Sequence, residues 1–104
     1  MSTKILRAPR TLSDTERVTR HAPMYKVLLH NDDITTVDFV ERDVCVGIFK
    51  LSASDAKRIT SEVHHTGIGL VGVYPFEQAE FKCDQVVSLA RGRGFPLNVT
   101  FEPE

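Results

Sequence analysis

Two clusters of polar residues in this 104-residue chain have side chains that could bind a ligand. The first is Asn31, Asp32 and Asp33, and the second is the adjacent pair His64 and His65. Positions two apart on an extended segment point the same way, so Asn31 and Asp33 can face one site. An amide oxygen, a carboxylate and a neutral imidazole nitrogen are all acceptors. Three such acceptors would match the three N–H bonds of an α-amino group, a cation with a pKa of about 8.

The charge in this arrangement would distinguish a free amine from a blocked one. A carboxylate about 4 Å from an ammonium gains roughly 4 kcal/mol at an effective dielectric constant near 20, before desolvation is subtracted. Each cluster also has an ordinary structural interpretation. Asn and Asp are common turn residues, and histidines at the C-terminus of a helix interact favourably with its dipole.

The elements that must position the first cluster follow from the hydrophobic pattern. A β-type run covers residues 24–30 and ends directly at Asn31. Thr35 or Thr36 is a good N-cap for a helix after the turn. That helix is predicted to carry Val37, Val40, Val44 and Ile48, with Phe39 and Phe49 nearby.

The second cluster belongs to a second predicted helix. Ser52 and Asp55 form a capping box at its start, and Gly67 fits its C-cap. A strand over residues 68–74 follows, and its glycines, Gly69 and Gly72, indicate close packing against another element. A third helix has Pro75 in its first turn, and residues 96–101 form the last strand. The residues expected to be buried by the third helix are Phe76, Ala79, Cys83, Val86, Val87 and Ala90.

The order β-α-α-β-α-β predicts one α+β domain. Three strands need a cover on one face, so the three helices are expected to lie over a three-stranded sheet, antiparallel or mixed, with antiparallel as our prediction. Residues 1–22 have scattered apolar positions without a period and are predicted to be a flexible N-terminal extension. Residues 23–104 form the folded core.

Charge and composition exclude several classes of partner. The formal charge is −1, and after the extension, with five basic and two acidic residues, the core has eight basic and twelve acidic residues. This balance argues against nucleic acid. No apolar run reaches the roughly 18 residues of a membrane span. Cys45 and Cys83 are expected to be reduced core residues of a soluble intracellular monomer, with no signal peptide.

Several motifs in the predicted core resemble the ClpS family, the N-degron-recognising adaptors of bacterial and plastid Clp proteases. The stretch from Met24 to Thr35, MYKVLLHNDDIT, resembles the opening signature of that family. Further matches are Val63-His64 with Gly67, Gly72-Val73-Tyr74 followed by Glu77, Ala79, Glu80 and Lys82, and the closing Pro96-Leu97 with Thr100. The resemblance covers about residues 23–104.

The resemblance implies a non-enzymatic adaptor without cofactor or metal. It would bind bulky hydrophobic N-terminal residues and deliver their proteins to the N-terminal domain of an AAA+ unfoldase of the ClpA or ClpC type, in the bacterial cytoplasm or plastid stroma. The implied amine- and peptide-binding residues are Asn31, Asp32, Asp33, Thr35 and His64; alternation favours Asp33 for the amine. The implied hydrophobic pocket is Val37, Val40, Thr60, Val63 and Leu97. Glu77 and Lys82 would face the unfoldase, and the extension would assist transfer.

Two positions depart from the family pattern. Val37 and Thr60 occupy places where ClpS proteins usually have methionine. Valine is shorter and stiffer than methionine, and the Thr60 hydroxyl needs a hydrogen-bond partner. We therefore hypothesise a shifted side-chain preference, either toward β-branched residues or toward Leu over large aromatic residues.

Two other classes of function are compatible with some of these residues. A metal-dependent hydrolase could use Asp32, Asp33, His64 and His65. Adjacent histidines on a helix, however, point about 100° apart, and no H-E-x-x-H pattern is present. A generic protein-interaction module of related fold would need the core but not the clustered acceptors.

Overall fold

The computed structural model describes residues 22–104, and their chain order is the predicted β-α-α-β-α-β. The elements are β1 (Met24–His30), η1 (Phe39–Val46), α2 (Ala53–Thr66), β2 (Ile68–Pro75), α3 (Phe76–Gly92) and β3 (Asn98–Pro103). The predicted extension lies outside the described residues except for Ala22. The single α+β domain is confirmed.

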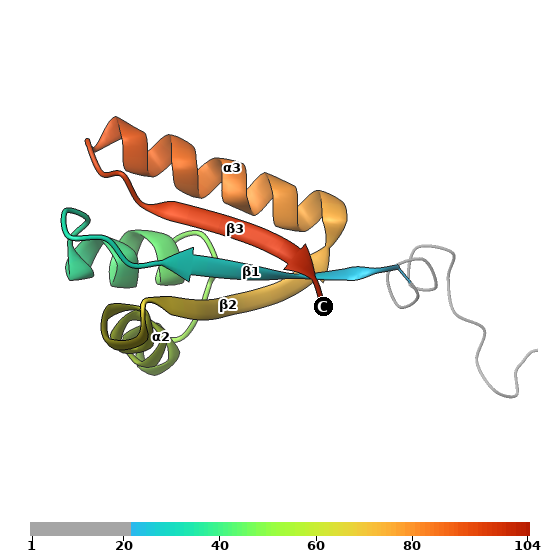
Figure 1. Ribbon diagram of the computed structural model, residues 1–104, viewed down its shortest axis with the longest axis horizontal. Helices are drawn as coiled ribbons and strands as arrows, with labels where there is room; N and C mark the ends of the chain where they lie inside the picture. Colours follow the sequence, from blue (N-terminus) through green and yellow to red (C-terminus); the bar gives the residue numbers. More distant parts are fainter. Residues whose placement is uncertain (1–21) are drawn as a thin grey trace, which may run out of the picture.

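The sheet has β1 at its centre, in the order β2-β1-β3, with both pairings antiparallel. Figure 1 shows this arrangement, with β1 between its two neighbours. Val27 and Leu29 on β1 are fully buried, whereas Leu70 and Thr100 on the neighbouring strands are exposed. The sheet therefore has one covered face and one open face. Helix α3 contacts all three strands, and α2 contacts β2 and η1.

Helix α3 buries a narrower stripe than predicted. Ala79, Cys83, Val86 and Ala90 are buried, but Phe76 is 46% exposed and Val87 is 36% exposed, so the prediction for these two was wrong. Both lie at the margin of a stripe with helical spacing. The Phe76 ring packs edge-on against Tyr25 instead, with 5.4 Å between ring centroids.

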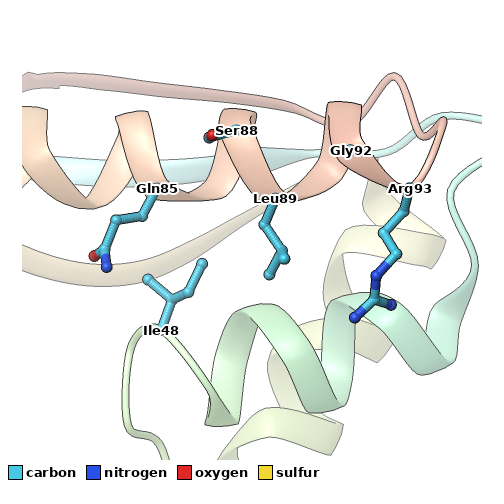
Figure 2. A pocket seen from close by; sticks show the side chains of 6 residues that line it. All are labelled: Ile48, Gln85, Ser88, Leu89, Gly92 and Arg93. Carbon is cyan, nitrogen blue, oxygen red and sulfur yellow. The ribbon is translucent and has the colours of Figure 1, made fainter.

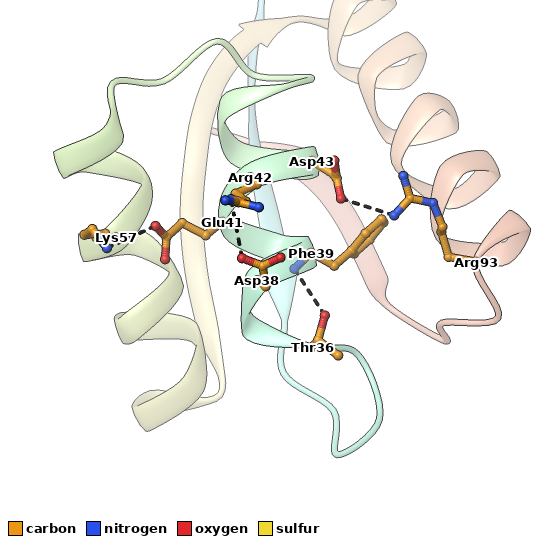
Figure 3. A network of polar contacts seen from close by, with 8 residues as sticks. All are labelled: Thr36, Asp38, Phe39, Glu41, Arg42, Asp43, Lys57 and Arg93. Carbon is orange, nitrogen blue, oxygen red and sulfur yellow. Dashed lines mark hydrogen bonds and ion pairs between the residues drawn. The ribbon is translucent and has the colours of Figure 1, made fainter.

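The first helix is a π-helix rather than the expected α-helix. Thr36 Oγ1 accepts a hydrogen bond from the Phe39 N–H (3.2 Å), as expected of an N-cap (Figure 3). The Gly47 N–H then donates to the Arg42 carbonyl, five residues back, at 3.0 Å. Val37, predicted for the buried stripe, is 51% exposed. The residues that the π-helix buries are Phe39, Val40, Val44 and Cys45.

Ion pairs connect η1 to both neighbouring helical segments, as Figure 3 shows. Glu41 pairs with Lys57 of α2 at 3.3 Å, and Asp43 pairs with Arg93 after α3 at 3.3 Å. Exposed pairs of this kind contribute about 0–1 kcal/mol each. At this magnitude the two pairs add little to the stability of η1, and its buried residues supply most of the stabilisation.

Helix α2 begins and ends at the predicted signals. Ser52 accepts a hydrogen bond from the Asp55 N–H, and Gly67 adopts the left-handed conformation with φ of 93°. Close packing at Gly69 is confirmed, because a Cβ there would lie 2.5 Å from Val63 Cγ2. Glycine thus lets β2 approach the last turns of α2.

Candidate functional site

A cavity of about 190 Å³ lies where the loop after β1, the start of η1 and the end of α2 meet. Nine of the ten residues predicted for amine, peptide and side-chain binding line it: Asn31, Asp32, Asp33, Thr35, Val37, Val40, Thr60, Val63 and His64. Leu97 is the exception. Its side chain is 1% exposed and packs in the hydrophobic core, which also contains the lining residues Val40 and Val63, so its place in the pocket stays a prediction.

One backbone hydrogen bond explains how the two polar clusters meet. The Asn31 N–H donates to the carbonyl oxygen of Gly67 at 2.9 Å. Asn31 follows the last residue of β1, and Gly67 follows the last turn of α2, which carries His64. This bond therefore joins the two chain segments that bear the acceptors.

Asp32 builds the turn that separates β1 from η1. Its Oδ1 accepts hydrogen bonds from the backbone N–H groups of Ile34 (2.8 Å) and Thr35 (2.7 Å). Burial alone would raise the pKa of Asp32. The N–H groups of Thr35 and Ile34, with the nearby Thr35 hydroxyl and the charge of Arg91, outweigh burial and lower that pKa below its ordinary value. Asp32 is thus held as a carboxylate.

Two polar atoms in the cavity lining lack a well-formed hydrogen bond. Asp32 Oδ2 and Thr35 Oγ1 are buried, and neither has a partner of good geometry among residues 22–104. The Thr35 hydroxyl is close enough to Asp32 to favour its charge, but the contact falls short of a hydrogen bond. Unpaired buried polar groups are costly, so this part of the wall is suited to a polar ligand group.

The other side of the cavity is apolar. Val40, Thr60 and Val63 are buried, and the exposed Val37 lies at the mouth. Thr60 is 3% exposed, and its Oγ1 lies 3.9 Å from Cys45 Sγ, within hydrogen-bonding range for sulfur. Burial raises the pKa of the Cys45 thiol, which therefore stays protonated. Both cysteines are buried and free, as predicted.

His65 does not line the cavity. Its Nδ1 lies 2.8 Å from the carbonyl oxygen of Ser61, and its ring is nearly perpendicular to that of His64, at 86°. Among residues 22–104, no three His, Cys, Asp or Glu side chains are grouped as metal ligands. The hydrolase alternative therefore has no ligand set in this part of the chain.

The two residues implied to face an unfoldase have different surroundings. Glu77 is exposed on the first turn of α3. The Lys82 ammonium donates to the Ile48 carbonyl oxygen at 3.3 Å and lies 5.7 Å and 5.4 Å from the ring centroids of Phe49 and Tyr74. Its charge is directed toward this chain's own segment after η1.

A larger hollow of about 570 Å³ lies between α3 and the end of η1. Figure 2 shows Ile48 and Leu89 facing each other in it, with Gln85 and Arg93 at the sides. None of the predicted site residues lines this hollow. In the described range, 22–104, no helix is long and apolar enough to cross a membrane.

Fold and site together define a small α+β binding domain whose cavity joins acceptors to an apolar wall. The family described as ATP-dependent Clp protease adaptor protein ClpS matches residues 20–100. The ClpS adapter of Desulfatibacillum aliphaticivorans is 45% identical over 93 residues, covering 89% of this chain and 88% of the relative. That of Clostridium acetobutylicum is 46% identical over 77 residues, covering 74% and 75%. The chain belongs to the ClpS family and is a Clp protease adaptor rather than an enzyme.

A solved structure agrees with this assignment. Agrobacterium tumefaciens ClpS2, described as bound to L-phenylalaninamide, superposes with a TM-score of 0.76 at 36% sequence identity. The match covers 81% of this chain and all of that one, at 100%.

Proposed function

We propose that this adaptor captures proteins by a free, bulky hydrophobic N-terminal residue and delivers them to an AAA+ Clp unfoldase. The observation that carries this proposal is the single cavity in which Asn31, Asp33 and His64 lie beside Val40 and Val63. Phenylalaninamide, bound to the Agrobacterium relative, has a free amine, an apolar side chain and an amide. The cavity offers a matching group for each.

The amine would be bound by the acceptors at the polar side. Asn31, Asp33 and His64 accept its N–H bonds, with Asp33 supplying the opposite charge. Residues 33–35 form a bend rather than an extended segment, so alternation alone does not separate the two carboxylates, and both line the cavity. Asp32 Oδ2 and Thr35 Oγ1, which lack partners, would then pair with the first peptide unit.

The apolar side would receive the first side chain. A cavity of about 190 Å³ holds about six water molecules at roughly 30 Å³ each, which a bulky side chain would displace. Burying a Leu or Phe side chain contributes roughly 1.5–3 kcal/mol. With the contacts of the amine and of the first peptide unit added, we expect binding near −8 kcal/mol. This corresponds to a micromolar dissociation constant, which suits transient delivery.

Peptides that differ only in their first residue test this proposal. By fluorescence anisotropy, a Phe- or Leu-initiated peptide is expected to bind at least about 10-fold more tightly than a Gly-initiated one, because glycine has no side chain to fill the cavity. A peptide with Phe at an internal position and Gly first is the control. Equal affinity for all three would exclude recognition of the first side chain.

The hypothesis of a shifted preference for the first side chain is tested at Val37, which lies at the mouth of the cavity. We expect Val37→Met to reduce the affinity for Ile- and Val-initiated peptides relative to Phe by about 10-fold, because methionine narrows the entrance. Val46→Met is the matched control, because Val46 is an exposed valine at the end of η1 that is absent from the cavity lining. An unchanged ranking in Val37→Met would refute the gate hypothesis.

Delivery would use the exposed start of α3. We assign contact with the unfoldase's N-terminal domain, of the ClpA or ClpC type, to Glu77 more than to Lys82, whose ammonium is already engaged. Glu77→Ala is expected to weaken binding of that domain several-fold while leaving peptide affinity unchanged, as measured by anisotropy with each partner. Loss of peptide binding instead would place Glu77 in a structural role.

Since the relatives are bacterial, we propose that the adaptor acts in the cytoplasm. We also propose that it acts there as a monomer.

A further inference from the structure

Thr60 has a special position among the described residues. It is the only polar or charged residue within residues 22–104 that is buried as a whole, and it lines the cavity. Its Cβ carries a hydroxyl and a methyl group, so rotation about one bond decides which of them faces the cavity. If the hydroxyl faced an apolar ligand and had no hydrogen-bond partner, it would weaken binding of that ligand.

Cys45 supplies the partner that settles this orientation. Its Sγ lies 3.9 Å from Thr60 Oγ1, the one side-chain hydrogen bond recorded for that hydroxyl within residues 22–104. Cys45 is 0% exposed and does not line the cavity. The bond therefore draws the Thr60 hydroxyl toward η1 and away from the ligand.

The π-helix makes this contact possible. Val40 lines the cavity, and Cys45 follows it by five residues. In an α-helix, at about 100° per residue, these two side chains would point about 140° apart. Bonding between residues five apart winds the chain more loosely. Val40 and Cys45 are then both buried, one beside the ligand cavity and the other against Thr60.

We propose that Cys45 is a positioning residue for side-chain recognition, because its bond to the Thr60 hydroxyl presents the Thr60 methyl group to the ligand. This inference rests on the proposed function, in which the cavity receives an apolar first side chain. It explains how Thr60, a polar residue, can line a pocket that receives an apolar side chain. Cys45 itself does not touch the bound peptide.

A double-mutant cycle with a Phe-initiated peptide tests the inference. Cys45→Ala is expected to weaken binding about 10-fold, because it frees the hydroxyl. In a Thr60→Val background, which has no hydroxyl to orient, the same substitution is expected to change the affinity less than about twofold. Cys45→Ser, which keeps a hydrogen-bonding partner, should retain most of the affinity in the Thr60 background.

The possible outcomes separate the inference from the function it rests on. If wild-type protein does not bind the peptide, both are overturned. If wild-type protein binds but Cys45→Ala has equal effects in the two backgrounds, only the positioning role is overturned. Should Cys45→Ala fail to fold, Cys45→Val fills the space without bonding, and the same cycle applies to it.

Discussion

Acetylation of the first residue of a Phe-initiated peptide is expected to weaken its binding to this adaptor by at least about 100-fold. The acetyl group removes the positive charge and two of the three N–H bonds of the amine. Asn31, Asp33 and His64, which line one cavity, are then desolvated without a matching donor. A 100-fold loss corresponds to about 2.8 kcal/mol, below the roughly 4 kcal/mol available to one close charge pair before desolvation.

The control for acetylation is the same peptide acetylated on an internal lysine, which changes charge but keeps the free N-terminus. Fluorescence anisotropy at fixed ionic strength compares the three peptides. Equal binding of the N-acetylated and free forms would leave the cavity as a general hydrophobic site and favour the generic interaction module.

Replacement of His64 by alanine is expected to weaken the binding of all free-amine peptides by about 10–150-fold without changing their ranking. His64 would bind the amine, which all such peptides share, so its loss removes a common contact of about 1.5–3 kcal/mol for a charged partner. Titrations with Phe- and Leu-initiated peptides measure the effect.

The neighbouring histidine provides a matched control for this substitution. His65 does not line the cavity, and its ring nitrogen lies 2.8 Å from the Ser61 carbonyl oxygen. His65→Ala should therefore leave peptide affinity within about twofold of wild type. A His64→Ala variant that weakened Phe but not Leu peptides would instead assign His64 to the side-chain pocket.

Local signals in the sequence were sufficient for much of the fold. The caps of α2 at Ser52 and Gly67 are hydrogen bonds between residues close in sequence. The close approach of β2 to α2 at Gly69 depends on the absence of a Cβ there. Strand β1 ended where the turn-forming Asn31 begins. Such features depend on neighbouring residues, so they could be predicted before any tertiary contact was known.

The features that were missed depend on packing. The spacing of Val37, Val40 and Val44 fits an α-helix and gives no sign of the hydrogen bonds between residues five apart that η1 contains. The Cys45 contact with Thr60 was missed for the same reason. Residues five apart are not expected on one side of an ordinary helix.

The residue pattern predicted the components of the candidate site but not how they come together. Each polar cluster could be recognised, but their meeting depends on the Asn31–Gly67 backbone bond, which joins segments 36 positions apart in the sequence. Family resemblance supplied that juxtaposition. The roles that the resemblance implies for Leu97 and Lys82 stay predictions: Leu97 packs in the core that also contains Val40 and Val63, and the Lys82 ammonium donates to the Ile48 carbonyl oxygen.

The central place of β1 has a mechanical consequence. The described chain enters β1 at Met24, whereas the ligand cavity adjoins its other end at Asn31, about 23 Å away for seven residues at roughly 3.3 Å each. A force on the segment before Met24 that is directed along β1 would shear the hydrogen bonds between β1 and its neighbours. The antiparallel pairings with β2 and with β3 would resist it together. Such a pull would therefore strain the sheet before it disturbed the far end, where the proposed peptide cavity lies.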